Sequence, residues 1–152
     1  MKWVIESVSQ AGGFLLGRGT YEMFAAHWPS ASAEERPLAR PLNALPKYVA
    51  SRTLEEPLVW QNSKLLKDDL VAAVTALKRE EGNDLLAIGS PVLVQTLFAH
   101  DLIDELRLMI DPVIIGGGKR FFRDDSVCRR LSRAARETTS TGAILATYAR
   151  SN

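Results

Sequence analysis

The chain reads AGGFLLGRGTYE over residues 11–22, and this stretch decides the fold that we expect. Its apolar run, residues 14–16, predicts a short strand that is buried on both faces. Gly17 ends the strand, and Thr20 can cap a helix over residues 21–28. A buried strand followed closely by a helix is typical of parallel sheets with crossover helices.

Further elements are predicted on either side of this stretch. Helices are expected where apolar residues recur at helical spacing, over residues 2–10, from Asp68 or Asp69 to Gly82, and from Ser90 to about His100. Strands are expected where apolar residues run between turn signals, at residues 47–51, 59–63, 84–88, 105–110 and 143–148, and residues 112–115 should continue extended after the fourth of these. Residues 29–41 should form a polar loop, and residues 116–118 a glycine turn. The order predicts a mixed, mainly parallel sheet with an antiparallel C-terminal edge and helices on both faces.

Composition places the chain among soluble globular proteins. Its 152 residues suffice for a single domain, here residues 1–152, with 46% hydrophobic and 24% charged residues. The net charge of +1 argues against nucleic acid or an anionic membrane as a partner. The single cysteine permits no internal disulfide, and nothing indicates a metal site. Without a secretory signal or a long apolar run, we expect a cytoplasmic location.

Two glycines, an arginine and a threonine follow the first strand. In open α/β sheets, ligands bind beyond the carboxyl ends of the strands. Gly17 and Gly19 let a ligand approach the backbone, Arg18 can donate two bonds to a phosphate, and Thr20 and the helix amides can hold that phosphate. The alternative is an ordinary helix start beside a surface arginine.

Two later strands end in the same way. Ser51-Arg52-Thr53 offers hydroxyl groups and a guanidinium suited to a ribose 2′-phosphate, or else forms a solvated strand end. Gly89-Ser90-Pro91 joins a buried strand to a helix, with Ser90 as the expected N-cap. Its amides and helix dipole can face a ligand, but ordinary capping explains the same residues.

Other candidate groups give no catalytic acid or base. His27 and His100 are isolated in the sequence and fit core or surface positions. Asp104 and Glu105 are adjacent, so in a strand they point to opposite faces and cannot act as a pair.

The ordered set of these junctions resembles the dihydrofolate-reductase-like family that includes the C-terminal reductase domain of the bifunctional riboflavin-biosynthesis deaminase/reductase. The matching stretches cover most of the chain: residues 11–22, 43–54, 88–97, 104–108 and 112–122. The resemblance implies a three-layer dihydrofolate-reductase-like fold, NADPH as cofactor, a small-molecule substrate and a homodimer.

The same resemblance implies roles for individual residues. Gly17, Arg18 and Thr20 would meet the phosphates of the cofactor, and Ser51 and Arg52 would lie beside its adenosine ribose and 2′-phosphate. A third set would sit against the pyrophosphate and the nicotinamide: Gly89, Ser90 and Val92.

The family's opening strand, with a turn similar to Ser-Leu-Asp-Gly, has no counterpart in this sequence. We therefore expect a domain that is shorter at its N-terminus than the family's, and we assign no catalytic acid. The expected function is hydride transfer from NADPH to a small pterin-like, pyrimidine-like or other unsaturated or carbonyl acceptor. The alternatives are a non-catalytic NADPH-binding remnant and a dimeric interaction domain.

Overall fold

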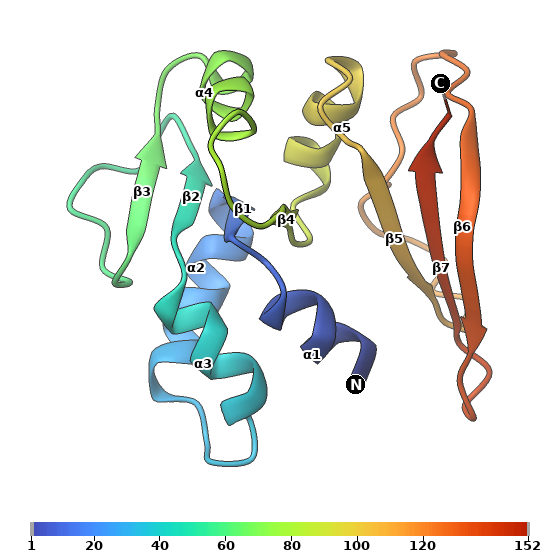
Figure 1. Cartoon of the computed structure of the whole chain (residues 1–152), viewed down its shortest axis with the longest axis horizontal. Helices are drawn as coiled ribbons and strands as arrows, with labels where there is room; N and C mark the ends of the chain where they lie inside the picture. The colour runs from blue at the N-terminus through green and yellow to red at the C-terminus, as the bar shows by residue number, and fades with distance from the viewer. Residues whose placement is uncertain (1, 152) are drawn as a thin grey trace. The chain divides into compact units, whose positions relative to one another are not determined.

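The apolar run at residues 14–16 forms the middle of strand β1 (Gly13–Gly17) in the computed structural model, which describes residues 2–151. Strand β1 pairs in parallel with β2 (Lys47–Ala50) on one side and with β4 (Leu85–Ala87) on the other. Strand β3 (Ser63–Leu66) extends the sheet beyond β2, so the order is β3-β2-β1-β4 (Figure 1). Because β1 is an inner strand, its apolar side chains are almost fully buried.

Helices cover both faces of this parallel sheet. They are α1 (Lys2–Ser9), α2 (Arg18–His27), the short 3-10 helix η1 (Trp28–Ser30), α3 (Arg36–Ala44) and α4 (Leu70–Leu77). The connections from β1 to β2 and from β3 to β4 cross the sheet in opposite directions. Since such crossovers are right-handed, α2 and α3 lie on one face and α4 lies on the other.

One apolar core joins α1, α2 and α3 to the sheet. The buried members of this core are Val8, Ala11, Phe14, Leu16, Tyr21, Leu42, Val49 and Trp60. Phe14 and Leu16 have no exposed surface, and they alternate with Leu15 along β1. Because alternate residues of a strand point to opposite faces, Phe14 and Leu16 face these helices and Leu15 faces the other side.

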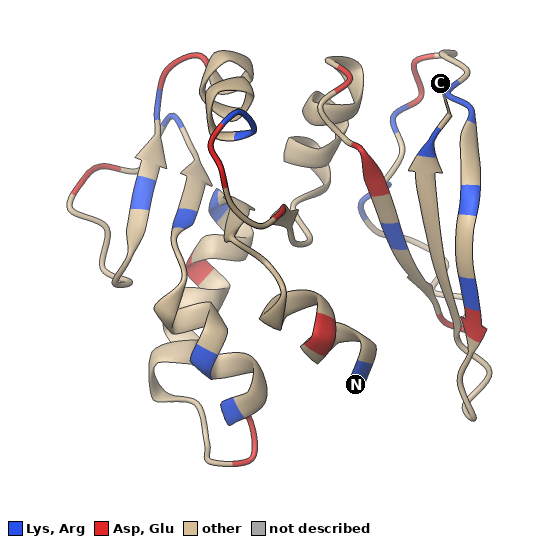
Figure 2. Ribbon diagram, in the orientation of Figure 1, with Lys and Arg blue, Asp and Glu red and all other residues tan. Residues whose placement is uncertain are grey.

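The later residues form a second, antiparallel sheet. Strands β5 (Glu105–Ile110), β6 (Leu131–Thr138) and β7 (Ile144–Arg150) pair in the order β5-β7-β6. The chain divides into two compact units, residues 1–94 and 95–152, and the boundary falls within α5 (Pro91–Ala99). Acidic and basic residues are interspersed in both units (Figure 2). Among residues 2–151, no helix is long and apolar enough to span a lipid bilayer.

The predicted fold class is confirmed: parallel strands with crossover helices come first, and antiparallel strands follow. Several boundaries were wrong. Helix α3 lies partly within the predicted loop 29–41, because Pro37 fits its first turn and the helix continues past Pro41. The strand predicted at 59–63 begins only at Ser63, because Trp60 is buried in the core instead.

Three more differences concern burial and pairing. Strand β6 was not predicted, because nearly all its residues are exposed and its few apolar residues do not alternate with the polar ones. Strand β4 is only half-buried, because it is the last strand of the sheet. Residues 112–115 are outside any strand, and Ile114 is 97% exposed.

A fully buried lysine connects β2 to the end of α3. The Nζ of Lys47 donates to the carbonyl oxygens of Leu42 at 2.8 Å, Leu45 at 2.9 Å and Asn43 at 3.3 Å. It also lies 4.4 Å from the centroid of the Trp60 ring. A cation at the C-terminus of a helix satisfies free carbonyl groups and complements the helix dipole. Burial nevertheless lowers the pKa of Lys47 to about 8.

The lowered pKa predicts how Lys47 contributes to stability as pH changes. Between pH 8 and the ordinary lysine value of 10.5, the unfolded chain binds more protons at this position than the folded chain does. The free energy of unfolding of the natural protein, relative to Lys47→Met, should therefore rise by up to about 3 kcal/mol across this window.

Urea unfolding of both proteins at several pH values in this window measures the difference. Lys64→Met removes an exposed lysine of β3 and serves as the control, for which we expect no such rise. A difference between the natural protein and Lys47→Met that is flat or falls with pH would contradict the prediction.

Candidate functional site

The three junctions predicted from the sequence lie at one edge of the parallel sheet. Strands β2, β1 and β4 are neighbours, and Gly17 is paired with Ala50 while Leu15 is paired with Ala87. The segments that follow these strands therefore emerge side by side. We call the following residues the carboxyl-edge cluster: Gly17, Arg18, Thr20, Ser51, Thr53, Gly89 and Ser90.

Ser90 connects two of the junctions. Its hydroxyl accepts a hydrogen bond from the Gly17 N–H at 2.8 Å. The same oxygen lies 2.9 Å from the Thr20 hydroxyl and 3.1 Å from the Ile88 carbonyl oxygen, either of which can accept its proton. Ser90 is only 9% exposed, so these bonds are shielded from water. The end of β1 and the start of α2 are thereby joined to the segment after β4.

The backbone around Ser90 is strained. Gly89 has a φ of +56° and Ser90 a φ of +53°, both in the left-handed region. Glycine tolerates this region, whereas a residue with a side chain is destabilised there. Such a conformation persists only where surrounding contacts hold it, and here the bond to Gly17 is one of them.

The three glycines at the ends of β1 and β4, Gly17, Gly19 and Gly89, have different environments. A Cβ on Gly17 would lie 3.2 Å from both the Cβ and the Oγ of Ser90, so Gly17 allows close packing within the protein. A Cβ on Gly89 would likewise lie 3.2 Å from the Thr20 hydroxyl. At Gly19 nothing lies within 4 Å of such an atom. Of the two glycines predicted to admit a ligand, only Gly19 has open space beside it.

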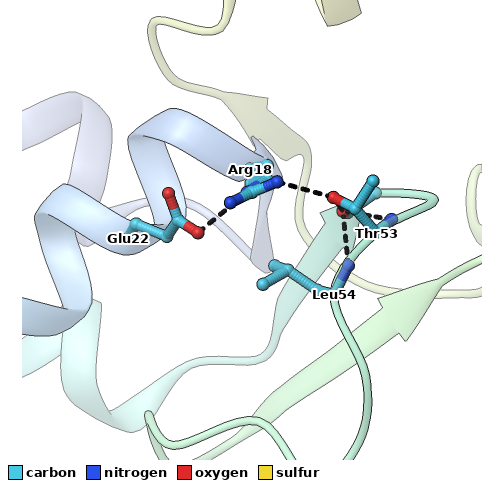
Figure 3. Close-up of polar contacts among 5 residues, drawn as sticks. Arg18, Glu22, Thr53 and Leu54 are labelled. Atoms are coloured by element: carbon cyan, nitrogen blue, oxygen red, sulfur yellow. Dashed lines mark hydrogen bonds and ion pairs between the residues drawn. The ribbon is translucent and has the colours of Figure 1, made fainter.

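Arg18 links helix α2 to the loop after β2. Its Nη1 donates to the Thr53 hydroxyl at 2.8 Å, and its Nε donates to Glu22 Oε1 at 2.8 Å (Figure 3). The Ser51 hydroxyl accepts bonds from the Thr53 N–H at 3.2 Å and the Leu54 N–H at 3.1 Å. The loop is thus turned by Ser51 and held to the helix by Arg18.

Two predicted helix starts differ in detail. Helix α2 begins at Arg18 with Gly17 as its N-cap and without a side-chain cap bond, so the prediction that Thr20 caps this helix was wrong. The Thr20 hydroxyl instead faces Ser90. Ser90 does precede α5, and its carbonyl oxygen accepts the Val94 N–H at 3.0 Å.

Two further predicted residues follow the same strands, one after β2 and one after β4. Arg52 follows Ser51 with an exposed side chain, and Val92 is 68% exposed in the first turn of α5. Sequence reasoning did not select Glu22, although it follows Arg18 by four residues. That spacing places two side chains together on a helix and could have identified the pair.

Relatives of this chain match it over nearly its whole length. The RibD C-terminal domain family matches residues 2–145. The uncharacterized protein YyaP of Bacillus subtilis (strain 168) is 29% identical over 143 residues, which cover 93% of this chain and 75% of YyaP.

Solved structures of low sequence identity share the fold. A putative riboflavin biosynthesis protein from Shewanella sp. PV-4 has a TM-score of 0.78 at 23% identity, over 97% of this chain and 78% of that chain. A pyrimidine reductase-like protein from Corynebacterium diphtheriae has a TM-score of 0.68 at 14% identity, over 99% and 80%. Acinetobacter baumannii RibD has a TM-score of 0.71 at 14% identity, over 97% and 49%. The predicted dihydrofolate-reductase-like fold is therefore confirmed.

The environment of Ser90 predicts unequal effects of two small substitutions. Ser90→Ala removes the acceptor of the Gly17 N–H and retains a Cβ at positive φ, so it should lower the free energy of unfolding by about 1–3 kcal/mol. Ser90→Gly loses the same hydroxyl but relieves the backbone, so its loss should be smaller by about 1 kcal/mol. Urea unfolding measures both values.

Ser126 provides the matched control, because it is exposed and has a φ of +56°. Comparing Ser126→Gly with Ser126→Ala gives the contribution of the positive φ alone to the free energy of unfolding, because Ser126 has no buried hydroxyl to lose. If Ser90→Ala were as stable as the natural protein, the hydroxyl would not hold the two junctions together.

Proposed function

The chain belongs to the RibD C-terminal domain family, and on that premise we propose that it is an NADPH-dependent reductase of a small molecule. Members of this family are NADPH-dependent reductases. The observation that carries the proposal is the convergence of three strand ends at one sheet edge. Each end contributes a hydroxyl group together with a guanidinium, a glycine or both. This edge is the general ligand-binding position in open α/β sheets.

The start of α2 fits a phosphate of the cofactor. Helix α2 has no side-chain cap, so its first amides lack that partner, and the space beside Gly19 is open. Amides at a helix N-terminus attract anions through both hydrogen bonds and the helix dipole.

The loop after β2 fits the 2′-phosphate that distinguishes NADPH from NADH. It carries Arg52 and is held by Arg18, so two guanidinium groups belong to one short region. Bonds between a guanidinium and a phosphate are strong because they are charge-assisted. We assign Arg18, Ser51 and Arg52 to this phosphate and its ribose, and Gly89, Ser90 and Val92 to the pyrophosphate and nicotinamide side.

When bound, NADPH would supply a hydride to an electron-poor acceptor. The carboxyl-edge cluster itself consists of glycine, arginine, serine and threonine, with no histidine, carboxylate or cysteine. We therefore assign binding and orientation to these residues, and not proton transfer. We propose a pterin-like, pyrimidine-like or other unsaturated or carbonyl acceptor. The pyrimidine reductase-like Corynebacterium diphtheriae protein of the same fold supports this class.

Calorimetric titration with NADPH and NADH tests the cofactor assignment. Arg52→Ala should weaken NADPH binding by about 10- to 100-fold, the loss expected for a hydrogen bond to a charged group. NADH lacks the 2′-phosphate, so its affinity should change less than about two-fold by the same reasoning.

Arg79→Ala is the control for this titration. Arg79 is exposed and lies between α4 and β4, where the chain enters the sheet rather than leaves it. Its removal should alter neither affinity. Equal losses of NADPH and NADH in Arg52→Ala would remove Arg52 from the 2′-phosphate site.

A further inference from the structure

Glu22 lies outside the carboxyl-edge cluster but holds one of its members. Its Oε1 accepts the Arg18 Nε–H at 2.8 Å, one helical turn away on α2. We propose that Glu22 is a positioning residue, which orients Arg18 toward the loop after β2 and so sets the preference for a 2′-phosphorylated cofactor. The inference rests on the proposed function and adds a specificity-determining residue to it.

The first step concerns which donors of Arg18 remain for a ligand. Glu22 takes the Nε donor, and Thr53 takes one donor of Nη1 (Figure 3). Within residues 2–151, Nη2 donates to no protein group. A guanidinium is planar and rigid, so binding two of its nitrogens at different places fixes the whole plane. The donors that remain for an anion are therefore those of Nη2 and the second hydrogen of Nη1.

The second step concerns entropy. The Arg18 and Glu22 side chains are 53% and 48% exposed, so without partners Arg18 would sample many rotamers in water. Ordering such a side chain on ligand binding lowers affinity, and a side chain that is already ordered avoids that loss. Glu22 and Thr53 hold Arg18 from two sides before any ligand arrives.

The third step explains why the effect is specific for the 2′-phosphate. The contact of Arg18 with Thr53 places it against the same loop that carries Arg52. The Glu22 carboxylate also offsets the charge of Arg18, so attraction by net charge alone is reduced. Recognition then depends on the orientation of the guanidinium, and NADPH gains from this orientation while NADH does not.

Titration of three variants with NADPH and NADH tests the inference. Glu22→Ala should raise the Kd for NADPH about 3- to 10-fold, the cost of ordering one long side chain. The Kd for NADH should change less than about two-fold, because no anion meets Arg18 there. Glu22→Gln keeps an acceptor for the Arg18 Nε–H and should restore the NADPH affinity. Glu6→Ala removes the acid of the Lys2–Glu6 pair, an equivalent helical pair on α1, and should change neither affinity.

A double-mutant cycle shows whether Glu22 acts through Arg18. In an Arg18→Ala background, adding Glu22→Ala should have no further effect on NADPH binding, because the group that Glu22 orients is gone. Additive losses, an unchanged NADPH to NADH ratio in Glu22→Ala, or an equal loss in Glu22→Gln would overturn the inference. A natural protein that does not prefer NADPH over NADH would instead refute the proposed function, so the two failures are distinguishable.

Discussion

The hydrogen bond from the Gly17 N–H to the Ser90 hydroxyl joins the segments that follow β1 and β4, at the carboxyl ends of the strands where the candidate site lies. Two strand-to-helix connections meet there, and each leaves backbone groups that the sheet no longer pairs. Ser90 satisfies one of these groups from a buried position. The close packing around this bond also accounts for the neighbouring glycines. Side chains at positions 17 and 89 would lie too close to Ser90 and Thr20. One shielded bond therefore explains a serine, two glycines and a strained backbone.

The opposite ends of the strands are held by a different kind of interaction. Lys47 begins β2 and places its charged group on the last carbonyl groups of α3, beside the ring of Trp60. The Trp60 indole N–H donates to Asn43 at 2.7 Å, and its backbone N–H donates to the Tyr21 hydroxyl at 3.1 Å. Buried polar groups with several partners favour a single arrangement of the elements that they join. Buried polar contacts thus hold the parallel sheet to its helices at both the amino and the carboxyl ends of its strands.

The contacts of Arg18 are of a third kind. They are exposed to water, where an ion pair contributes little to the free energy of folding. Their value is in orientation, because a binding group held in place loses less freedom when a ligand arrives. The proposed site therefore combines a buried part, formed by Gly17, Thr20 and Ser90, with exposed polar contacts of Arg18. These exposed contacts contribute little to folding.

Much of this protein could be predicted from local sequence patterns. The apolar run at residues 14–16, the capping Asp69 and the alternation at residues 105–110 indicate strands and helices through short-range chemistry, and the structure has them. The ends of successive strands likewise indicated which residues would gather at one edge, because parallel strands share a direction.

Tertiary packing decided the rest. Strand β6 forms because β7 pairs with it, and Trp60 is buried because α2, α3 and β2 all contact it. The residues adjacent in sequence reveal neither of these contacts. The Ser90 bond to Gly17 and the Arg18 bond to Thr53 join residues 73 and 35 positions apart, and only the folded chain brings such partners within hydrogen-bond distance.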